Sequence, residues 1–76
     1  NKSINVHTVE SEISKELTKI QKKYLKKVDI GSYPFFRLGR IGVSIVLRSS
    51  IKKKLDSCFF DIKKMIKNKK LKVFKN

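Results

Sequence analysis

Few side chains in this 76-residue sequence are of the types that perform catalysis or bind metal ions. His7 is the only histidine, so a multi-histidine metal site is excluded. No good nucleophile lies beside it, and we expect His7 to be a polar residue on a short strand. Glu10, Glu12 and Glu16 lie close together, but the dipole at the start of a helix already explains acidic residues there. The sequence therefore predicts no general acid-base pair.

The single cysteine and the three glycines also indicate structural roles. Cys58 falls in the apolar stripe of an amphipathic segment, whereas a reactive thiol needs an exposed, electropositive environment. We expect it to pack in the core of a protein kept in the reducing cytoplasm. Gly31, Gly39 and Gly42 do not have the spacing of a phosphate-binding loop. We therefore predict that this chain is not an enzyme and that its own residues bind no cofactor.

The charge is strongly basic, with 20 Lys and Arg residues against six Asp and Glu residues and a net charge of +14. One interpretation is weak, salt-dependent binding of nucleic acid. The other is an ordinary solvated surface enriched in lysine by compositional bias. The candidate polyanion contacts lie on one segment and are Lys52, Lys53, Lys54, Lys63, Lys64 and Lys67. No apolar run approaches the ~20 residues needed to cross a bilayer, and we expect no membrane contact.

The spacing of apolar residues predicts the elements that position these side chains. Alternation indicates strands at residues 3–7, 28–36, 41–48 and 71–74, the second of them ending or bulging near Tyr33 and Pro34. Spacings of three and four residues indicate a helix over residues 9–26, capped by Thr8, and another from a Ser49 or Ser50 cap to about Asn68.

The resulting β-α-β-β-α-β order predicts an α+β, ferredoxin-like fold, with two helices on one face of an antiparallel sheet. RNA-recognition modules share this order but need aromatic residues on the first and third strands. Here neither of those strands contains Phe, Tyr or Trp. Unless a neighbouring domain or subunit covers it, the second face of the sheet is open.

Two stretches carry a resemblance to a known family. V-D-I-G-S-Y-P-F-F at residues 28–36 and G-V-S-I-V-L-R-S at residues 42–49 resemble the C-terminal region of competence/damage-inducible protein A-type proteins. The segment E-S-E-I-S-K-E-L at residues 10–17 is similar to the preceding helix, whereas Ile51 departs from the polar residue expected there. The resemblance implies a parent with an N-terminal molybdopterin-binding-like domain, which would bind a molybdopterin or nucleotide-like ligand and a divalent metal.

The resemblance implies that this chain is a single accessory domain, residues 1–76, at the C-terminal side of its parent. The absence of an initiator Met agrees with that expectation. Its partners would be the N-terminal domain and, in a homo-oligomer, a second copy. The candidate interface residues are Gly31, Ser32, Tyr33, Pro34, Phe35 and Phe36. Two interpretations of this segment stay open: Gly and Pro shaping a turn, or a surface docking on the parent domain.

Overall fold

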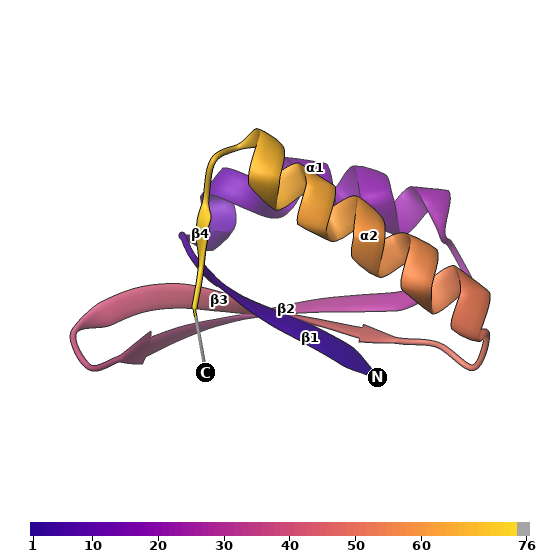
Figure 1. Cartoon of the computed structure of the whole chain (residues 1–76), viewed down its shortest axis with the longest axis horizontal. Helices are drawn as coiled ribbons and strands as arrows, with labels where there is room; N and C mark the ends of the chain where they lie inside the picture. The colour runs from indigo at the N-terminus through magenta and orange to yellow at the C-terminus, as the bar shows by residue number, and fades with distance from the viewer. Residues whose placement is uncertain (75–76) are drawn as a thin grey trace.

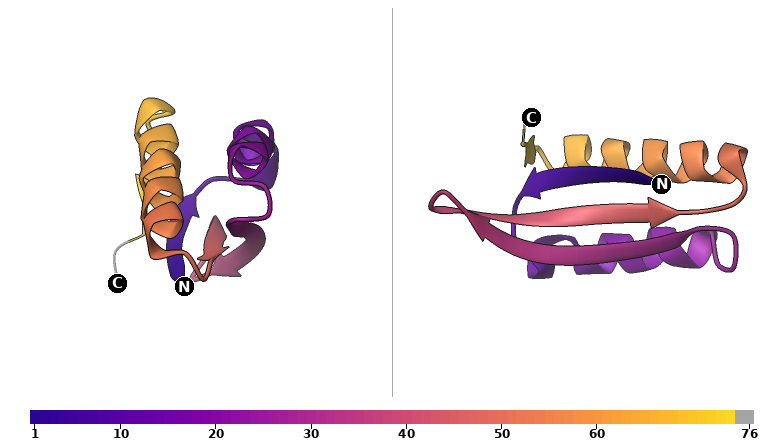
Figure 2. Two further views of the ribbon diagram at one scale, coloured as in Figure 1. Left: turned by 90° about the vertical axis from the view of Figure 1, so that its right-hand side faces the viewer. Right: turned by 90° about the horizontal axis from the view of Figure 1, so that it is seen from below.

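A computed structural model, which describes residues 1–74, shows one antiparallel four-stranded sheet with both helices on the same face (Figures 1 and 2). The predicted ferredoxin-like order is confirmed. The elements are β1 Lys2–His7, α1 Glu10–Lys23, β2 Asp29–Arg37, β3 Arg40–Arg48, α2 Lys52–Asn68 and β4 Lys72–Val73. The strand order β2-β3-β1-β4 places β3 between β1 and β2 and antiparallel to both, which is the split βαβ arrangement.

The core lies between the helices and the inner strands. Directly opposite residues of an antiparallel pair share a face, and the pairs Val6 with Val43 and Ile4 with Ile45 turn their side chains toward the helices. The helices and the residue after α1 contribute buried side chains at helical spacing, namely Ile13, Leu17, Tyr24, Leu55, Cys58, Ile62, Met65 and Ile66. Val9 and Ile51, which the spacing also placed in the apolar stripes, are exposed. Because each helical stripe has only this sheet face to cover, the two stripes merge into one core. None of the helices described over residues 1–74 is long and apolar enough to span a bilayer.

Neither helix begins with the predicted cap. Val9 and Ile51 occupy the N-cap positions, and neither helix has a side-chain cap hydrogen bond. The Ser49 hydroxyl instead donates to the Lys27 carbonyl at 2.6 Å and accepts from the Ile51 amide at 3.0 Å. Ser49 therefore joins the turn before α2 to the turn after α1. The Thr8 hydroxyl has only a 3.5 Å contact with the carbonyl oxygen of Val9.

The predicted interruption of the second strand at Tyr33 and Pro34 is wrong. Strand β2 pairs with β3 along its whole length, from Asp29 with Arg48 to Arg37 with Arg40. The Ile30 amide faces away from β3, because it donates to the Gln21 side chain at 2.9 Å. Pro34 lies four residues further along the strand and so directs its nitrogen to the same outer edge, where no ladder bond is lost. Proline is tolerated because β2 is an edge strand.

Strand β4 is shorter than the predicted segment of residues 71–74. Only Lys72 and Val73 pair with β1, while Leu71 packs against the core. The Phe74 amide still donates to the Asn5 carbonyl at 2.8 Å, so the chain continues along β1 past the strand.

Candidate functional site

Among the side chains with catalytic potential, Glu16 and Asp61 line a common hollow of about 320 Å³, whereas His7 and Cys58 do not line it. The His7 ring stacks on Phe74 with centroids 3.5 Å apart. A hydrogen bond from Lys69 lowers the pKa of the Glu16 carboxyl. Within residues 1–74 there is no group of three or more His, Cys, Asp or Glu side chains placed to hold a metal ion. Burial raises the pKa of the Cys58 thiol to about 11, so it is protonated and unreactive at neutral pH.

A second cluster joins the two helices. The Tyr24 hydroxyl donates to Asp61 Oδ2 at 2.6 Å, and Lys23 Nζ lies 2.9 Å from the same oxygen. Burial alone would raise the pKa of Asp61, but the hydrogen bonds from Tyr24 and Lys23 outweigh it and lower that pKa. Burial and the Asp61 hydrogen bond raise the pKa of Tyr24 to about 12. The phenol therefore stays a hydrogen-bond donor, and the cluster clamps α1 to α2.

A hollow of about 560 Å³ opens at the end of the molecule where β2 begins and β3 ends. Its charged lining residues, Lys26, Lys27, Asp29 and Arg48, are all exposed. The Ser49 hydroxyl in its wall is already bonded to two backbone groups. The hollow is thus a surface feature lined by positive and negative side chains.

The structure separates the six predicted interface residues onto two faces. Gly31, Tyr33 and Phe35 are on the open face of the sheet, whereas Ser32, Pro34 and Phe36 are on the helix side. Tyr33 lies across Gly31, since a Cβ on Gly31 would be 2.7 Å from the Tyr33 hydroxyl oxygen. The I-G-S-Y-P segment is therefore an edge strand in which Gly makes room for Tyr, and the predicted Gly-Pro turn is wrong.

An aromatic cluster on the open face was not foreseen from the sequence. A Cβ on Gly42 would come within 2.6 Å of the Phe35 ring and 2.7 Å of the Phe74 ring, so both rings lie against this glycine. The two ring centroids are 5.2 Å apart, and the Arg37 guanidinium lies 5.5 Å from the Phe35 ring. An aromatic residue paired with a glycine on the neighbouring strand could have indicated this cluster. Recognising that pair requires the register of β2 against β3, which the sequence alone does not give.

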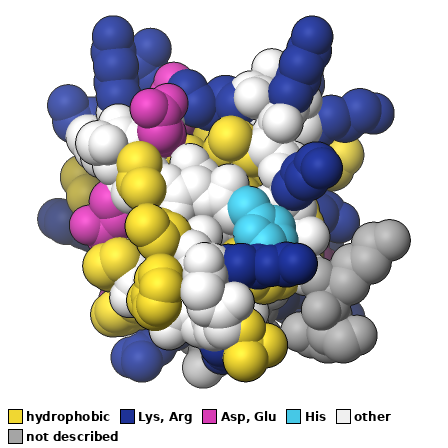
Figure 3. Space-filling model, turned by 90° about the vertical axis from the view of Figure 1, so that its left-hand side faces the viewer, with side chains coloured by type: hydrophobic (Ala, Val, Ile, Leu, Met, Phe, Trp, Pro, Cys, Tyr) yellow, Lys and Arg dark blue, Asp and Glu magenta, His cyan; other side chains and the backbone are white. Residues whose placement is uncertain are grey.

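The tip of the β2–β3 hairpin forms a second unforeseen surface, which we call the hairpin arm, residues 36–41. Its apolar side chains are exposed: Phe36 by 71%, Leu38 by 92% and Ile41 by 55%. The hairpin extends beyond the ends of both helices (Figure 1), and apolar side chains gather on one side of this end of the molecule, next to acidic as well as basic ones (Figure 3). The apolar residue inside R-L-G-R, a turn sequence, was the signal in the sequence.

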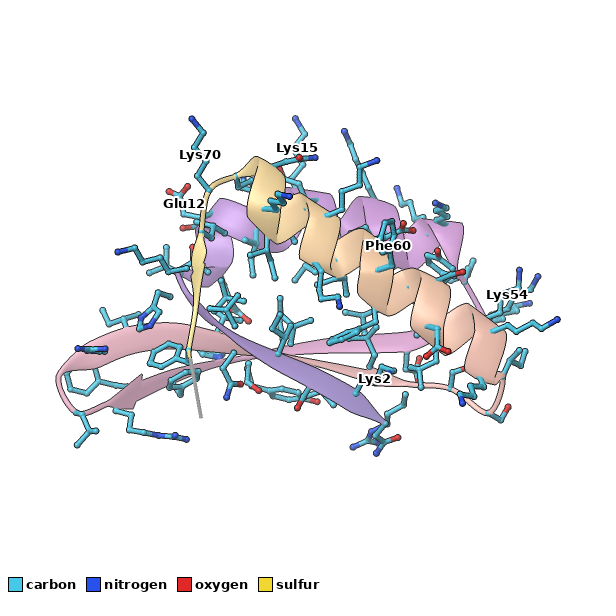
Figure 4. The ribbon with its side chains drawn as sticks, viewed as in Figure 1. Lys2, Glu12, Lys15, Lys54, Phe60 and Lys70 are labelled. Carbon is cyan, nitrogen blue, oxygen red and sulfur yellow. The ribbon has the colours of Figure 1, made fainter. Side chains whose placement is uncertain are left out.

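The six candidate polyanion-binding lysines of α2 are all exposed. Most of them fall on the side of α2 opposite its buried residues. The Lys63 amine lies 5.0 Å from the centre of the Phe59 ring. Lysines of other segments point outward as well, as Lys15 and Lys70 show in Figure 4. Three of the six candidates, Lys63, Lys64 and Lys67, line a hollow of about 410 Å³ with Phe60 and Asn68. The other lysines of the described residues are spread over several elements.

Comparison with protein families gives one match. A family model described as FAD synthase, middle domain, matches residues 1–75. The searches of curated proteins and of solved structures found no match.

This match corrects the predicted relationship and function. The predicted membership among competence/damage-inducible protein A-type proteins is wrong, and so is the function inferred from it, an accessory role in a molybdopterin-binding or cofactor-pyrophosphatase protein. The physical reason is that the short I-G-S-Y-P motif reflects local packing on an edge strand, with Tyr33 over Gly31 and Pro34 at the outer edge. The alternative function, a nucleic-acid-binding module, is not supported by the match either.

Proposed function

Since the chain belongs to the family of FAD synthase middle domains, we propose that it is a non-catalytic domain that packs against another domain of an FAD synthase. FAD synthase is an enzyme, and a middle domain implies other domains in the same protein. In this proposal the chemistry belongs to those other domains. The middle domain supplies a folded surface that holds a neighbour in position, in the cytoplasm, where its free thiol stays reduced.

The observation that carries this proposal is the exposed apolar surface of the hairpin arm. Small domains bury a modest share of their surface, so their apolar side chains are needed in the core. Here Phe36, Leu38 and Ile41 instead lie together outside it. Exposed apolar residues that cluster, unlike scattered ones, mark contact surfaces.

The contacts of the polar groups support a structural role. His7 is stacked on Phe74, Cys58 is buried, and the Asp61 carboxylate is bonded to Tyr24 and Lys23. Asp61 does line a hollow of about 320 Å³ together with Glu16. Each of these two carboxylates is paired with a lysine, Asp61 with Lys23 and Glu16 with Lys69, so both serve the packing of this domain.

Thiol labelling of an intact FAD synthase containing this domain tests the proposal. Leu38→Cys and Phe60→Cys place a thiol at two exposed apolar positions, of which Phe60 is 63% exposed on α2, away from the arm. We expect a maleimide to modify residue 38 at least tenfold more slowly than residue 60, as located by peptide mass spectrometry. Buried Cys58 serves as an unlabelled reference. Equal labelling rates at 38 and 60 would overturn the proposal.

A further inference from the structure

We infer that the hairpin arm inserts into an apolar groove edged by carboxylates on a flanking domain of the same protein. This inference rests on the proposed function and deepens it, because it names the inserting element and the chemistry of its receptor.

The geometry of the arm suits insertion. Phe36 and Ile41 are directly opposite each other in the register of β2 and β3, so their side chains lie together on the helix side of the sheet. The helices stop short of this end of the hairpin (Figures 1 and 2). Phe36 is 71% exposed and Ile41 55% exposed. Leu38 adds a third apolar side chain at the tip.

The backbone at the tip is costly for a leucine. Leu38 has φ 54° and Gly39 has φ 74°, and two positive φ values in a two-residue hairpin loop are those of a type I′ turn. This turn favours Asn, Asp or Gly at its first position, and a left-handed residue with a branched side chain costs roughly 1 kcal/mol. Leu38 combines this cost with almost complete exposure, so its side chain gives the isolated fold no compensating contact. A receptor groove would supply that contact.

The charges of the arm indicate the charge of the surface that would receive it. Arg37 and Arg40 are the closing pair of the hairpin, both are exposed, and neither has an acidic partner among the ion pairs of the described residues. Carboxylates at the edge of a groove would complement them. A second copy of the chain is a poor receptor, because face-to-face hairpins would bring four arginines together in molecules that each carry +14.

Pairing through the outer edge of β2 is obstructed at Ile30 and Pro34, which favours recognition through the side chains of the arm. The Gln21 amide donates to the Val28 carbonyl at 2.7 Å, and its oxygen accepts from the Ile30 amide, which occupies the outer edge of β2. Pro34 lacks an amide hydrogen further along the same edge. At the other edge of the sheet, β4 has only two residues.

Zero-length cross-linking of the intact FAD synthase tests the inference. Arg37→Lys and Arg40→Lys introduce amines that a carbodiimide joins to carboxylates in direct contact. We expect cross-linked peptides between residue 37 or 40 and Asp or Glu of a flanking domain in the same molecule. Lys67, on the exposed side of α2, serves as the native control and should give no such product.

A second variant separates side-chain insertion from chance proximity. Adding Leu38→Glu should lower the yield of the arm cross-links roughly tenfold, which corresponds to about 1.4 kcal/mol of lost docking free energy. The matched change Phe60→Glu should leave the yield unaltered, and circular dichroism checks that both variants fold.

The outcomes distinguish this inference from the proposed function. Slow maleimide labelling of residue 38 without any carbodiimide cross-link from residue 37 or 40 would overturn the inference and leave the proposed function intact. Arm cross-links between two copies, recognised by mixing isotopically labelled and unlabelled protein, would also overturn it. Slow maleimide labelling of residue 38 that appears only when nucleic acid is added would also overturn the inference.

Discussion

Asp61 shows how one carboxylate can join two helices. Its Oδ2 atom accepts from Tyr24, at the end of α1, and contacts Lys23 beside it. The Tyr24 side chain is buried, so its hydroxyl needs this partner. The sequence showed Tyr24 as part of an apolar stripe but gave no sign of Asp61, which is 37 residues away, because such a contact exists only once the helices are packed.

We expect Asp61→Ala to lower the free energy of unfolding by about 1–3 kcal/mol, because it leaves the buried Tyr24 hydroxyl without its charged acceptor. Chemical denaturation measures this loss. The control is Asp56→Ala, since Asp56 is also in α2 but has only a 3.8 Å contact with Lys2, with both side chains largely exposed. Its effect should stay below ~0.5 kcal/mol. Equal losses in the two variants would contradict the structural role of Asp61.

The same cluster should produce a loss of stability at high pH. The pKa of Tyr24 rises from 10.0 to about 12 in the folded protein, so the folded state holds the phenolic proton more tightly than the unfolded state. Its contribution is complete below pH 10 and is lost as the pH rises through about 12. Denaturation between pH 9 and 12 should show this loss in the native protein relative to Tyr24→Phe. Parallel curves for the two proteins would contradict it.

The lowered pKa of Asp61 affects stability at low pH, where the free energy of unfolding falls as the pH drops through that pKa.

At the scale of elements, α2 begins with the wrong charge for its dipole. Lys52, Lys53 and Lys54 form the start of the helix, and its first turn has no acidic residue. We expect Lys52→Glu to stabilise the fold by about 0.3–1 kcal/mol relative to Lys67→Glu, which lies in the last turn. Both variants change the net charge equally, so the difference in their melting temperatures reports the effect of the position of the charge along the helix. Indistinguishable melting temperatures would argue against the dipole effect.

We expect Leu38 in the hairpin arm to lower the stability of the domain and to strengthen its docking. Leu38→Asn creates an Asn-Gly pair, the preferred sequence for a type I′ turn, and removes an exposed apolar side chain. We expect the free energy of unfolding of the domain to increase by about 0.5–1 kcal/mol, as measured by denaturation. The same change should weaken docking in the cross-linking assay. A variant that is destabilised would show that Leu38 makes contacts within the fold that the structure does not contain.

The elements themselves were largely predictable, and their ends were not. Apolar residues at helical spacing identified α1 and α2, because burial against a sheet imposes that period. The caps failed because the Ser49 hydroxyl is used by Lys27, from a different turn. Pro34 was taken as an interruption because its tolerance depends on strand order, which places β2 at the edge and which no local pattern contains.

At the scale of the whole molecule, the fold followed from the order of elements, but the family did not. Two amphipathic helices and four strands have few ways to bury their apolar faces together, and the observed sheet is one of them. The family resemblance rested on residues 28–36, whose pattern is explained by Tyr33 lying over Gly31. A motif with a local packing cause can recur in unrelated families. Phe35 and Phe36 were among the predicted interface residues. Their partners Gly42 and Ile41 were missed, because each pair comes together only through register.

The net charge leads to the last prediction, which concerns ionic strength. A charge of +14 is carried by a molecule with a radius of gyration of 11.9 Å, so most of its cations lie within one or two screening lengths of each other at low salt. Repulsion among them opposes compaction. The described residues contain three ion pairs, Lys2 with Asp56, Lys23 with Asp61 and Lys69 with Glu16. Added salt weakens these attractions, which lowers the stability of the fold. Because exposed pairs contribute little, we expect repulsion to dominate and the melting temperature to rise by several degrees between roughly 10 and 200 mM NaCl.

A double variant identifies the cause of that rise. Lys52→Glu with Lys63→Glu lowers the net charge by four at exposed positions that form none of the three ion pairs. Scanning calorimetry should then show a shallower increase of melting temperature with salt, since fewer like charges remain to be screened. A melting temperature that falls with added salt would mean that the ion pairs outweigh the repulsion. In that case the lysines stabilise the fold through ion pairs. An acidic surface on a flanking domain would then not be needed to neutralise the excess positive charge.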